Sequence, residues 1–544
     1  MKKIRLTAAV LSLLMLAAVY AGCNKTKRDP EALQIAVIAK GYGSAYADAL
    51  KEGYEKKHPD KVIQIVKRTP DTNFFRTTLQ TGERNNIDLY FVLTHDMFEM
   101  MTVKNYVKGY DEALADLSDV FSAPAEGYLE SGAGVTYASL MDDYALDIMT
   151  FRDGKQYGVP WASGVVGLLY NKTLFDLVNG NLSSGEEPFT LPRTTAEMFD
   201  LFGRIRALDD SRKNSAYPFV YSGSVGYTSM MFAPWWAQYD GIDSVYKFME
   251  GKDAGGNYSA ECYNTRGRFL AYETISKMIR RDSHNVSAAD STKDFTQAQL
   301  DFLEGKAFFN SNGEWLEREA SSDFLPGEAD VAFMKMPIIS EITEKLTVIK
   351  NEAQLRAAID YIDGVKTLSE LNSAAGLALT ADHADIIRLT EARKVRYNEY
   401  TYIANVPSYS DKIDLAKDFL KYMLSKEGQE TFMRSSYGAM APLNKVALSQ
   451  FDYYNPDPVG NRDKTKCTLM TKSKFDMFYN SVSFALYKHP ITYMSKMPLI
   501  SHDPSPESAF GLASPQSVQT FFDNEVSRRR TAWNSYMDAA GLNG

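Results

Sequence analysis

The stretch that decides the fold is GKQYGVPWASGVVGLLYNKTLF, residues 154–175. It opens on a charged turn, and Pro160 then requires an extended backbone at the residue before it. VVGLLY, residues 165–170, is apolar and has the length of a buried strand. Asn171 can cap a helix that begins at Lys172. The stretch therefore predicts a turn, an extended segment, a buried strand and a helix in direct succession.

Upstream of this stretch, short apolar runs alternate with helical patterns. LQIAVIA (33–39), VIQIV (62–66) and DLYFVL (88–93) are predicted strands, and the segments between them have helical periodicity. This alternation predicts an α/β unit with a largely parallel sheet. Ligands of such sheets bind beyond the carboxyl ends of the strands, which directs attention to loops 40–43 and 94–96.

Length and composition limit the classes of protein to which the chain can belong. Its 544 residues are enough for two or three ordinary domains with large cores. A content of 44% hydrophobic and 24% charged residues is typical of a globular protein. The net charge of −9 argues against nucleic acid as a partner, because phosphate binding requires a basic face.

The N-terminus has the form of a secretion signal. A basic start and an apolar run lead through small residues to Cys23, and the run is too short for a convincing membrane span. We predict that residues 1–22 are a signal peptide and that residues 23–32 are a polar tether. The end of the signal peptide, together with Cys23, resembles a bacterial lipobox, which implies lipidation of Cys23. Tyr20 departs from the usual aliphatic residue of that motif. Ordinary cleavage that leaves a free thiol is the alternative, and either event leaves a net charge of about −12.

Motifs for catalysis or metal binding are missing from the sequence. The six histidines are scattered, without a His-Glu-x-x-His pattern, and there is neither a Gly-x-Ser-x-Gly elbow nor a Gly-x4-Gly-Lys loop. Cys262 and Cys467 have no Cys-x-x-Cys spacing, so they either pair or remain buried thiols. We therefore predict no metal, no cofactor and no enzymatic activity. A surface-anchored glycoside hydrolase is the enzymatic alternative, since 69 acidic residues leave room for a carboxylate pair.

Five motifs in order resemble family 1 extracellular solute-binding proteins, relatives of maltose-binding protein. The opening stretch is similar to the family's Gly-Lys-x-Tyr-Gly-Val-Pro, strand and Tyr-Asn-Lys-x-Leu-Phe region. LPRTTAEMFDLFGRIR (191–206) resembles its Pro-x-Thr-Trp-x-Glu-Phe helix start, with Thr195 in place of tryptophan. Residues 299–319 resemble the family's Phe-x-x-Gly-Lys-Ala strand and the Gly-x-Trp that follows it. DVAFMKMPII (330–339) resembles the family's strand that ends in proline. Residues 413–445 resemble its Ala-x-x-Phe-Leu-x-Tyr-Leu helix and Gly-x-x-Pro.

The resemblance implies a two-lobed α/β fold of the type II periplasmic-binding-protein-like class, with mixed sheets flanked by helices and a hinged cleft. It assigns residues 33–161 plus 403–445 to the first lobe and residues 162–402 plus 446–544 to the second. Residues 341–398 exceed the family's usual linker and are compatible with an inserted subdomain.

By the same resemblance, the chain would be a monomeric, lipid-anchored solute receptor of an ABC importer. Hinge closure would capture the ligand for the transmembrane subunits of the permease. The receptor would be exported to the outer face of the cytoplasmic membrane, or to the periplasmic side in a cell with two membranes.

The implied ligand is a carbohydrate, in particular an oligosaccharide, with a non-sugar solute as the alternative. A sugar ring requires flat aromatic platforms and fixed polar groups. Only one of the adjacent Trp235 and Trp236 is expected to face the cleft, because neighbouring side chains point apart. Core packing is the alternative for each tryptophan. The candidate ligand-binding residues are Tyr42, Asp71, Thr94, Trp161, Tyr221, Trp235, Trp236, Asn312, Glu314, Trp315 and Tyr402.

Overall fold

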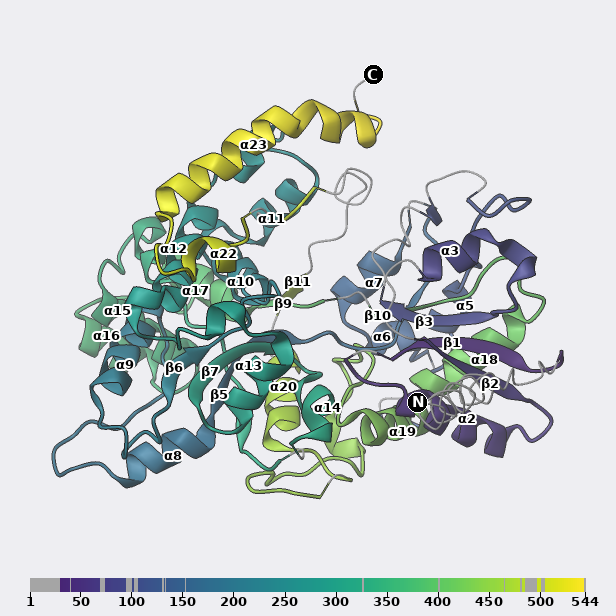
Figure 1. Ribbon diagram of the computed structural model, residues 1–544, viewed down its shortest axis with the longest axis horizontal. Coiled ribbons are helices and arrows are strands. Elements are labelled where there is room, and N and C mark those ends of the chain that lie inside the picture. Colours follow the sequence, from purple (N-terminus) through teal and green to yellow (C-terminus); the bar gives the residue numbers. More distant parts are fainter. Residues whose placement is uncertain are drawn as a thin grey trace, which may run out of the picture.

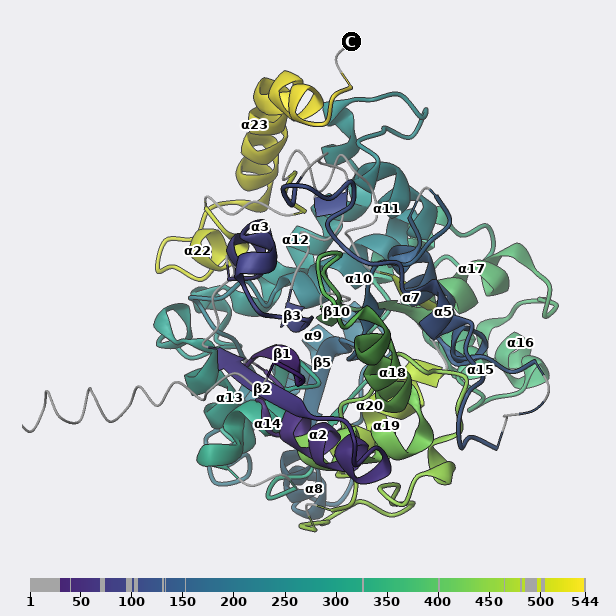
Figure 2. The ribbon, with the colours of Figure 1, turned by 90° about the vertical axis from the view of Figure 1, so that its right-hand side faces the viewer.

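Two lobes lie next to each other in the computed structural model, a smaller one that contains the N-terminal strands and a larger one (Figure 1). The structure describes residues 30–542 apart from residues 40, 69–73, 94–99, 102–105, 130–131, 133, 152, 325–326, 400–401, 464, 480–481, 485–496 and 500–503. The smaller lobe, turned toward the viewer in Figure 2, has its own sheet with helices beside it. The predicted two-lobed α/β fold with mixed sheets is confirmed. The predicted signal peptide, Cys23, Asp71 and Thr94 lie outside the described residues.

The first sheet is built from β1 (Leu33–Ile38), β2 (Ile63–Arg68), β3 (Leu89–Leu93), β4 (Val159–Pro160) and β10 (Tyr402–Asn405), in the order β2-β1-β3-β10-β4. β1 is parallel to β2 and β3, whereas β10 is antiparallel to β3 and β4. All six residues of β1 are buried, as its largely apolar sequence predicts. The helices of this lobe are α2 (Ala45–Lys57), α3 (Phe74–Gln80), α5 (Ser118–Phe121), α6 (Tyr137–Leu140), α7 (Asp143–Met149), α18 (Ile413–Leu424) and α19 (Lys426–Ser436).

The second sheet is built from β5 (Val166–Asn171), β6 (Tyr217–Val220), β7 (Ala307–Gly313) and β8 (Val331–Phe333), in the order β6-β7-β5-β8. β5 is antiparallel to β7 and β8, and β6 is parallel to β7. Asn171 caps α8 (Lys172–Gly180), because its side chain accepts a hydrogen bond from the Leu174 N–H at 3.1 Å. The strand and the helix predicted in the opening stretch are therefore both present.

Helices surround the second sheet, and three of them come from residues 341–398. α15 packs on α16 and α17, and α17 packs on α10. The helices of this lobe are α8, α9 (Thr195–Ala207), α10 (Ser229–Asp240), α11 (Ile242–Met249), α12 (Arg266–Ile279), α13 (Phe295–Leu303), α14 (Leu316–Glu319), α15 (Glu352–Ile362), α16 (Leu368–Ala375), α17 (Ala384–Lys394), α20 (Leu469–Tyr479), α22 (Pro506–Phe510) and α23 (Val518–Ala539).

The C-terminal segment, residues 446–542, is held on the second lobe by buried polar contacts. α20 packs on β8, and α22 and α23 pack on α12. Glu525 of α23 forms a fully buried ion pair with Arg268 of α12 at 3.2 Å. Glu507 of α22 accepts a hydrogen bond from Thr228 Oγ1 at 2.5 Å, directly before α10. Figure 1 shows α23 along the outer edge of the larger lobe.

Two of the passages of the chain between the lobes touch each other. The first crossing joins β4 of the first sheet to β5 of the second. The second follows β9 (Val395–Tyr397), which pairs in parallel with β11 (Val482–Phe484), and leads into β10. The Glu399 N–H donates to Gly164 O at 2.8 Å, and Asn398 Nδ2 donates to Ser163 O at 3.1 Å. The small residues Ser163 and Gly164 at the first crossing therefore permit close contact of two backbones.

Gly164 is required at this contact. Its φ is +63°, and a Cβ atom would lie 2.2 Å from the carbonyl oxygen of Glu399. We expect Gly164→Ala to lower the free energy of unfolding by about 3 kcal/mol, through backbone strain and a clash with a backbone atom. Urea unfolding measures this loss. Gly154→Ala is the matched control, since Gly154 has a φ of +78° but nothing near its Cβ position. Equal losses in the two variants would contradict the role of the contact.

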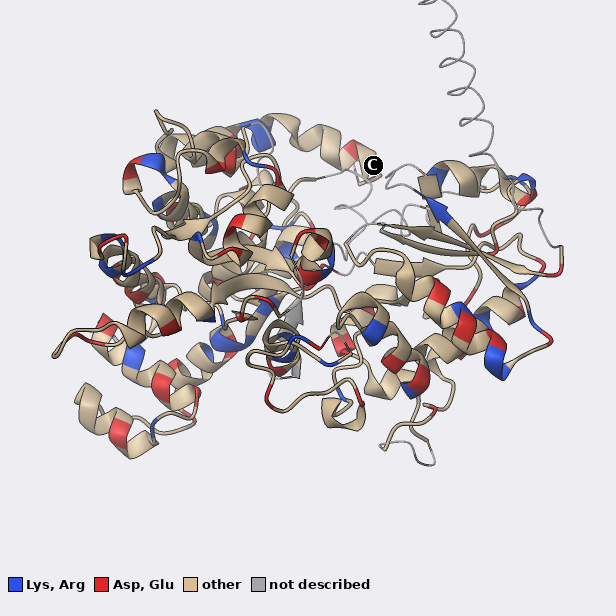
Figure 3. Ribbon diagram, turned by 60° about the horizontal axis from the view of Figure 1, so that its bottom comes forward, with Lys and Arg blue, Asp and Glu red and all other residues tan. Residues whose placement is uncertain are grey.

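Charged residues of both signs are interspersed over both lobes (Figure 3). None of the helices in the described part of the chain combines the length and the apolar character needed to cross a bilayer.

Candidate ligand cleft between the lobes

Four aromatic side chains meet where the lobes face each other. Tyr42 follows β1, Trp161 follows β4 and Tyr402 begins β10, whereas Trp315 directly precedes α14 of the second lobe. The ring centroid of Tyr42 lies 5.6 Å from that of Trp161, 4.8 Å from that of Tyr402 and 6.3 Å from that of Trp315. All four residues are at most 3% exposed. The structure thus brings together four residues singled out in the sequence, which we call the interlobe cluster.

Glu314, beside this cluster, accepts hydrogen bonds from the first lobe, the crossing and the C-terminal segment. Tyr42 Oη donates to Oε1 at 2.5 Å, and the Gly164 N–H donates to the same oxygen at 3.0 Å. Ser163 Oγ donates to Oε2 at 2.8 Å, and Lys474 Nζ of α20 lies 3.0 Å from Oε2. A carboxylate offers about four lone-pair sites. In this arrangement of the lobes, the Glu314 carboxylate therefore binds groups of the protein and connects the first lobe, the crossing and the C-terminal segment.

Lys474 supplies the countercharge of Glu314 inside the protein. The two side chains are 2% and 0% exposed. Burial lowers the pKa of Lys474, and the Glu314 charge opposes that shift. Lys474 Nζ also donates to Gly438 O. Each charge of this desolvated pair depends on the other, because water is not available to solvate it.

The two tyrosines of the interlobe cluster carry neutral hydroxyl groups. Burial, followed by the charge of Glu314, raises the pKa of Tyr42 well above its usual value. Burial, followed by the charge of Glu399, does the same to Tyr402. Both phenols therefore remain protonated at physiological pH.

Tyr227 joins the interlobe cluster although it was not among the predicted residues. It lies two residues before α10, and its ring centroid is 6.5 Å from that of Trp315. Tyr221 was predicted instead, but its hydroxyl lies against Gly511 in the C-terminal segment, 2.1 Å from the position of a Cβ there. The sequence signal for Tyr227 is an aromatic residue at the position before the N-cap residue of a helix, here Thr228.

The remaining predicted residues are buried inside the second lobe. Trp235 Nε1 donates to Pro337 O at 3.0 Å. Trp236 Nε1 donates to Asp240 Oδ2 at 3.0 Å, and the Arg268 guanidinium lies 5.0 Å from the Trp236 ring. The structure brings neither tryptophan into the interlobe cluster. Asn312 lies on β7, 1% exposed, where its amide donates to Asn310 Oδ1 at 3.1 Å.

Glu317 of α14 is a further buried carboxylate. It is 4% exposed and accepts hydrogen bonds from Thr468 Oγ1 at 2.7 Å and from the Gly327 N–H at 3.2 Å. Burial raises its pKa from 4.5 to about 7. The folded state therefore holds the proton more tightly than the unfolded state. The contribution of Glu317 to the free energy of unfolding is fully present below pH 4.5 and is lost as the pH rises through 7.

We expect Glu317→Gln to remove most of this pH dependence, which corresponds to about 3 kcal/mol. Urea unfolding of wild type and variant, measured between about pH 4.5 and about pH 8, provides the comparison. Glu52→Gln, at an exposed position of α2, is the control and should retain the wild-type slope. A wild-type slope in Glu317→Gln would assign the pH dependence to another group.

Metal and disulfide chemistry find no support in the described part of the chain. Among these residues, no group of three or more His, Cys, Asp or Glu side chains is placed to hold a metal ion. Cys262 and Cys467 are both buried free thiols, which decides between the two alternatives left by the sequence.

Comparison with known proteins places this architecture in a family. The family model of bacterial extracellular solute-binding proteins matches residues 39–430. Apo RafE from Streptococcus pneumoniae is 12% identical with a TM-score of 0.55, over 94% of this chain and 99% of that chain. Maltose-bound MalE3 from T. maritima is 14% identical with a TM-score of 0.52, over 92% and 100% of the two chains. A chitin oligosaccharide binding protein is 14% identical with a TM-score of 0.53, over 92% and 99%. No curated protein sequence gives a match. Because the family model matches more than half of this chain, the chain belongs to the bacterial extracellular solute-binding proteins.

Proposed function

We propose that the protein is the solute receptor of an ABC importer and that it captures a carbohydrate, in particular an oligosaccharide, between its lobes. The observation that carries this proposal is the interlobe cluster, to which both lobes contribute aromatic rings. Such rings provide platforms for the apolar faces of sugar rings. The proteins of like fold include one with maltose bound and one named for a chitin oligosaccharide, which supports the same ligand class.

Ligand capture would proceed by separation and closure of the lobes. With the lobes apart, Tyr42, Trp161 and Tyr402 would face Trp315 and Tyr227 across an open cleft. A sugar between them would replace contacts that the rings now make with one another. The ligand would stabilise the closed form only by the difference between its affinities for the two forms. The proposed lobes are residues 33–161 plus 403–445 and residues 162–402 plus 446–544, with Tyr402 at the boundary, where it begins strand β10 of the first sheet.

The remaining parts of the proposal concern location and partners. Residues 1–22 would be removed, Cys23 would be lipidated, and the tether that follows would hold the receptor on the outer face of the cytoplasmic membrane. The monomeric receptor would present its closed form to the permease, whose ATPase subunits supply the energy. The chain itself would catalyse no reaction.

Isothermal titration of the chain from Asn24 onward, which contains every described residue, tests the proposal against a panel of oligosaccharides. We expect saturable binding with a Kd of about 1 μM or below, equivalent to about −8 kcal/mol, and recovery of intact sugar afterwards. Cleaved sugar would identify a glycoside hydrolase instead. Absence of binding to every glycan would overturn the carbohydrate assignment.

A further inference from the structure

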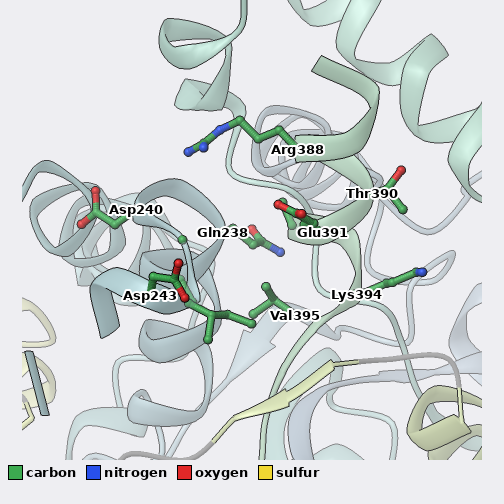
Figure 4. A pocket seen from close by; sticks show the side chains of 12 residues that line it. Gln238, Asp240, Asp243, Arg388, Thr390, Glu391, Lys394 and Val395 are labelled. Atoms are coloured by element: carbon green, nitrogen blue, oxygen red, sulfur yellow. The ribbon is translucent and has the colours of Figure 1, made fainter. Parts of the chain in front are cut away.

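A cavity of about 570 Å³ lies in the second lobe (Figure 4). Its walls come from the end of α10, the first turn of α11, the second half of α17 and the start of β9. No residue of the interlobe cluster lines it. The volume is in the range of pockets that bind small molecules.

Two residues that line this cavity carry a buried hydrogen-bond donor. Gln238 is 2% exposed, and its Oε1 accepts a hydrogen bond from the Ile339 N–H at 3.1 Å, which fixes the amide. Its buried Nε2 forms no hydrogen bond with any described residue. Arg388 Nη2 donates to Tyr239 O at 2.7 Å, and its buried Nε is likewise without a partner in the described part of the chain. Buried donors are normally satisfied, so the pair favours a ligand with an acceptor group, such as a carboxylate.

Carboxylates of the protein line the same cavity. Glu391 and Asp243 are both exposed, and the side chains of Glu391 and Gln238 point toward one space, whereas Lys394 points away from it (Figure 4). A third carboxylate, Asp240, already binds an indole N–H and a lysine. Glu391 and Asp243 therefore favour a ligand that also carries a cationic donor, such as an ammonium group.

We propose that this cavity binds a free amino acid in its zwitterionic form. Its carboxylate would accept hydrogen bonds from Gln238 and Arg388, and its ammonium group would donate to Glu391 and Asp243. None of the described residues that line the cavity is aromatic, so the cavity has no flat ring on which a sugar could stack. An apolar side chain of the ligand would lie against Ala237, Ala392 and Val395. The proposal is independent of the carbohydrate assignment.

Isothermal titration of the chain from Asn24 onward with each of the twenty L-amino acids tests the ligand class. We expect at least one to bind with a Kd of about 1 mM or below. Its N-trimethylated analogue keeps the carboxylate but has no N–H donor, and its amide keeps the ammonium but has no carboxylate. We expect both to bind at least about tenfold more weakly. Absence of binding to all twenty would overturn the proposal, and so would equal binding of the analogues.

Substitutions then test the location. Gln238→Leu and Glu391→Gln are each expected to weaken amino-acid binding at least about tenfold. Glu391 is exposed, so its substitution tests the site even if Gln238→Leu fails to fold. Lys394→Met is the matched control, because its side chain lines the cavity but points away from Gln238 (Figure 4). Wild-type affinity in Glu391→Gln would overturn the assignment. Oligosaccharide titrations of the same variants report on the interlobe cluster separately.

Discussion

Lys474→Met is expected to lower the free energy of unfolding by about 3–5 kcal/mol. The substitution leaves the Glu314 carboxylate buried without its countercharge, 3.0 Å from where the ammonium was. The three neutral donors from Tyr42, Ser163 and Gly164 remain. They do not compensate for a full charge inside the protein. Urea unfolding measures the loss.

Two further variants separate the ion pair from the loss of a long side chain. Lys472→Met, on the same helix, removes a more exposed lysine that pairs with Asp476, and we expect a change of about 0.5 kcal/mol or less. The double variant Glu314→Gln with Lys474→Met removes both buried charges. We expect it to be more stable than Lys474→Met alone by about 2 kcal/mol or more. A double variant as unstable as the single one would show that packing of the lysine chain, not its charge, is what matters.

Trp315→Ala is expected to weaken binding of the oligosaccharide about 100-fold, equivalent to about 2.7 kcal/mol. Its ring lies against Tyr42 and Tyr402 of the opposite lobe, with centroids 6.3 and 6.0 Å away. Once the lobes separate, the ring becomes free to contact a ligand. Truncation should therefore affect the affinity for sugar more than the free energy of unfolding. Isothermal titration and urea unfolding of the same variant provide both quantities.

Trp161→Ala supplies the contrasting case. This ring packs against Tyr46, Phe91 and Phe432, all in the first lobe, with centroids 5.1, 5.9 and 6.1 Å away. We expect its truncation to lower the free energy of unfolding by about 3–5 kcal/mol, whether or not sugar is present. Wild-type affinity for the oligosaccharide in Trp315→Ala would contradict the proposal that the ligand binds at the interlobe cluster. Wild-type stability in Trp161→Ala would contradict its place in the core.

Local sequence patterns were sufficient for the framework of the fold. The apolar run of β1, the strand–helix step at Asn171 and the alternation before residue 93 each depend on neighbours in the sequence, so they were predictable from it. The ion pairs of the C-terminal segment were not predictable, because the spacing of Lys474 and Glu314 in sequence carries no information about their distance in space.

The candidate site was predictable where a loop follows a strand directly. Tyr42, Trp161 and Tyr402 lie at the ends of strands of one sheet, so the topology alone brings them to one edge. Trp235 and Trp236 lie instead within a helix buried on all sides, where a tryptophan fills the core as readily as a cleft. Whether a residue on such a helix faces a ligand depends on packing from distant segments.

The position of the C-terminal segment has a consequence for the order of folding. Lys474, Glu507 and Glu525 provide the partners of Glu314, Thr228 and Arg268, which are synthesised long before them. Until α23 emerges, Arg268 lies among aromatic rings without Glu525, its ion-pair partner in the folded protein. A premature stop after α19 would therefore leave the first lobe with all of its strands and the second without three of its buried partners. The second lobe can therefore complete this set of buried contacts only after α23 has been synthesised.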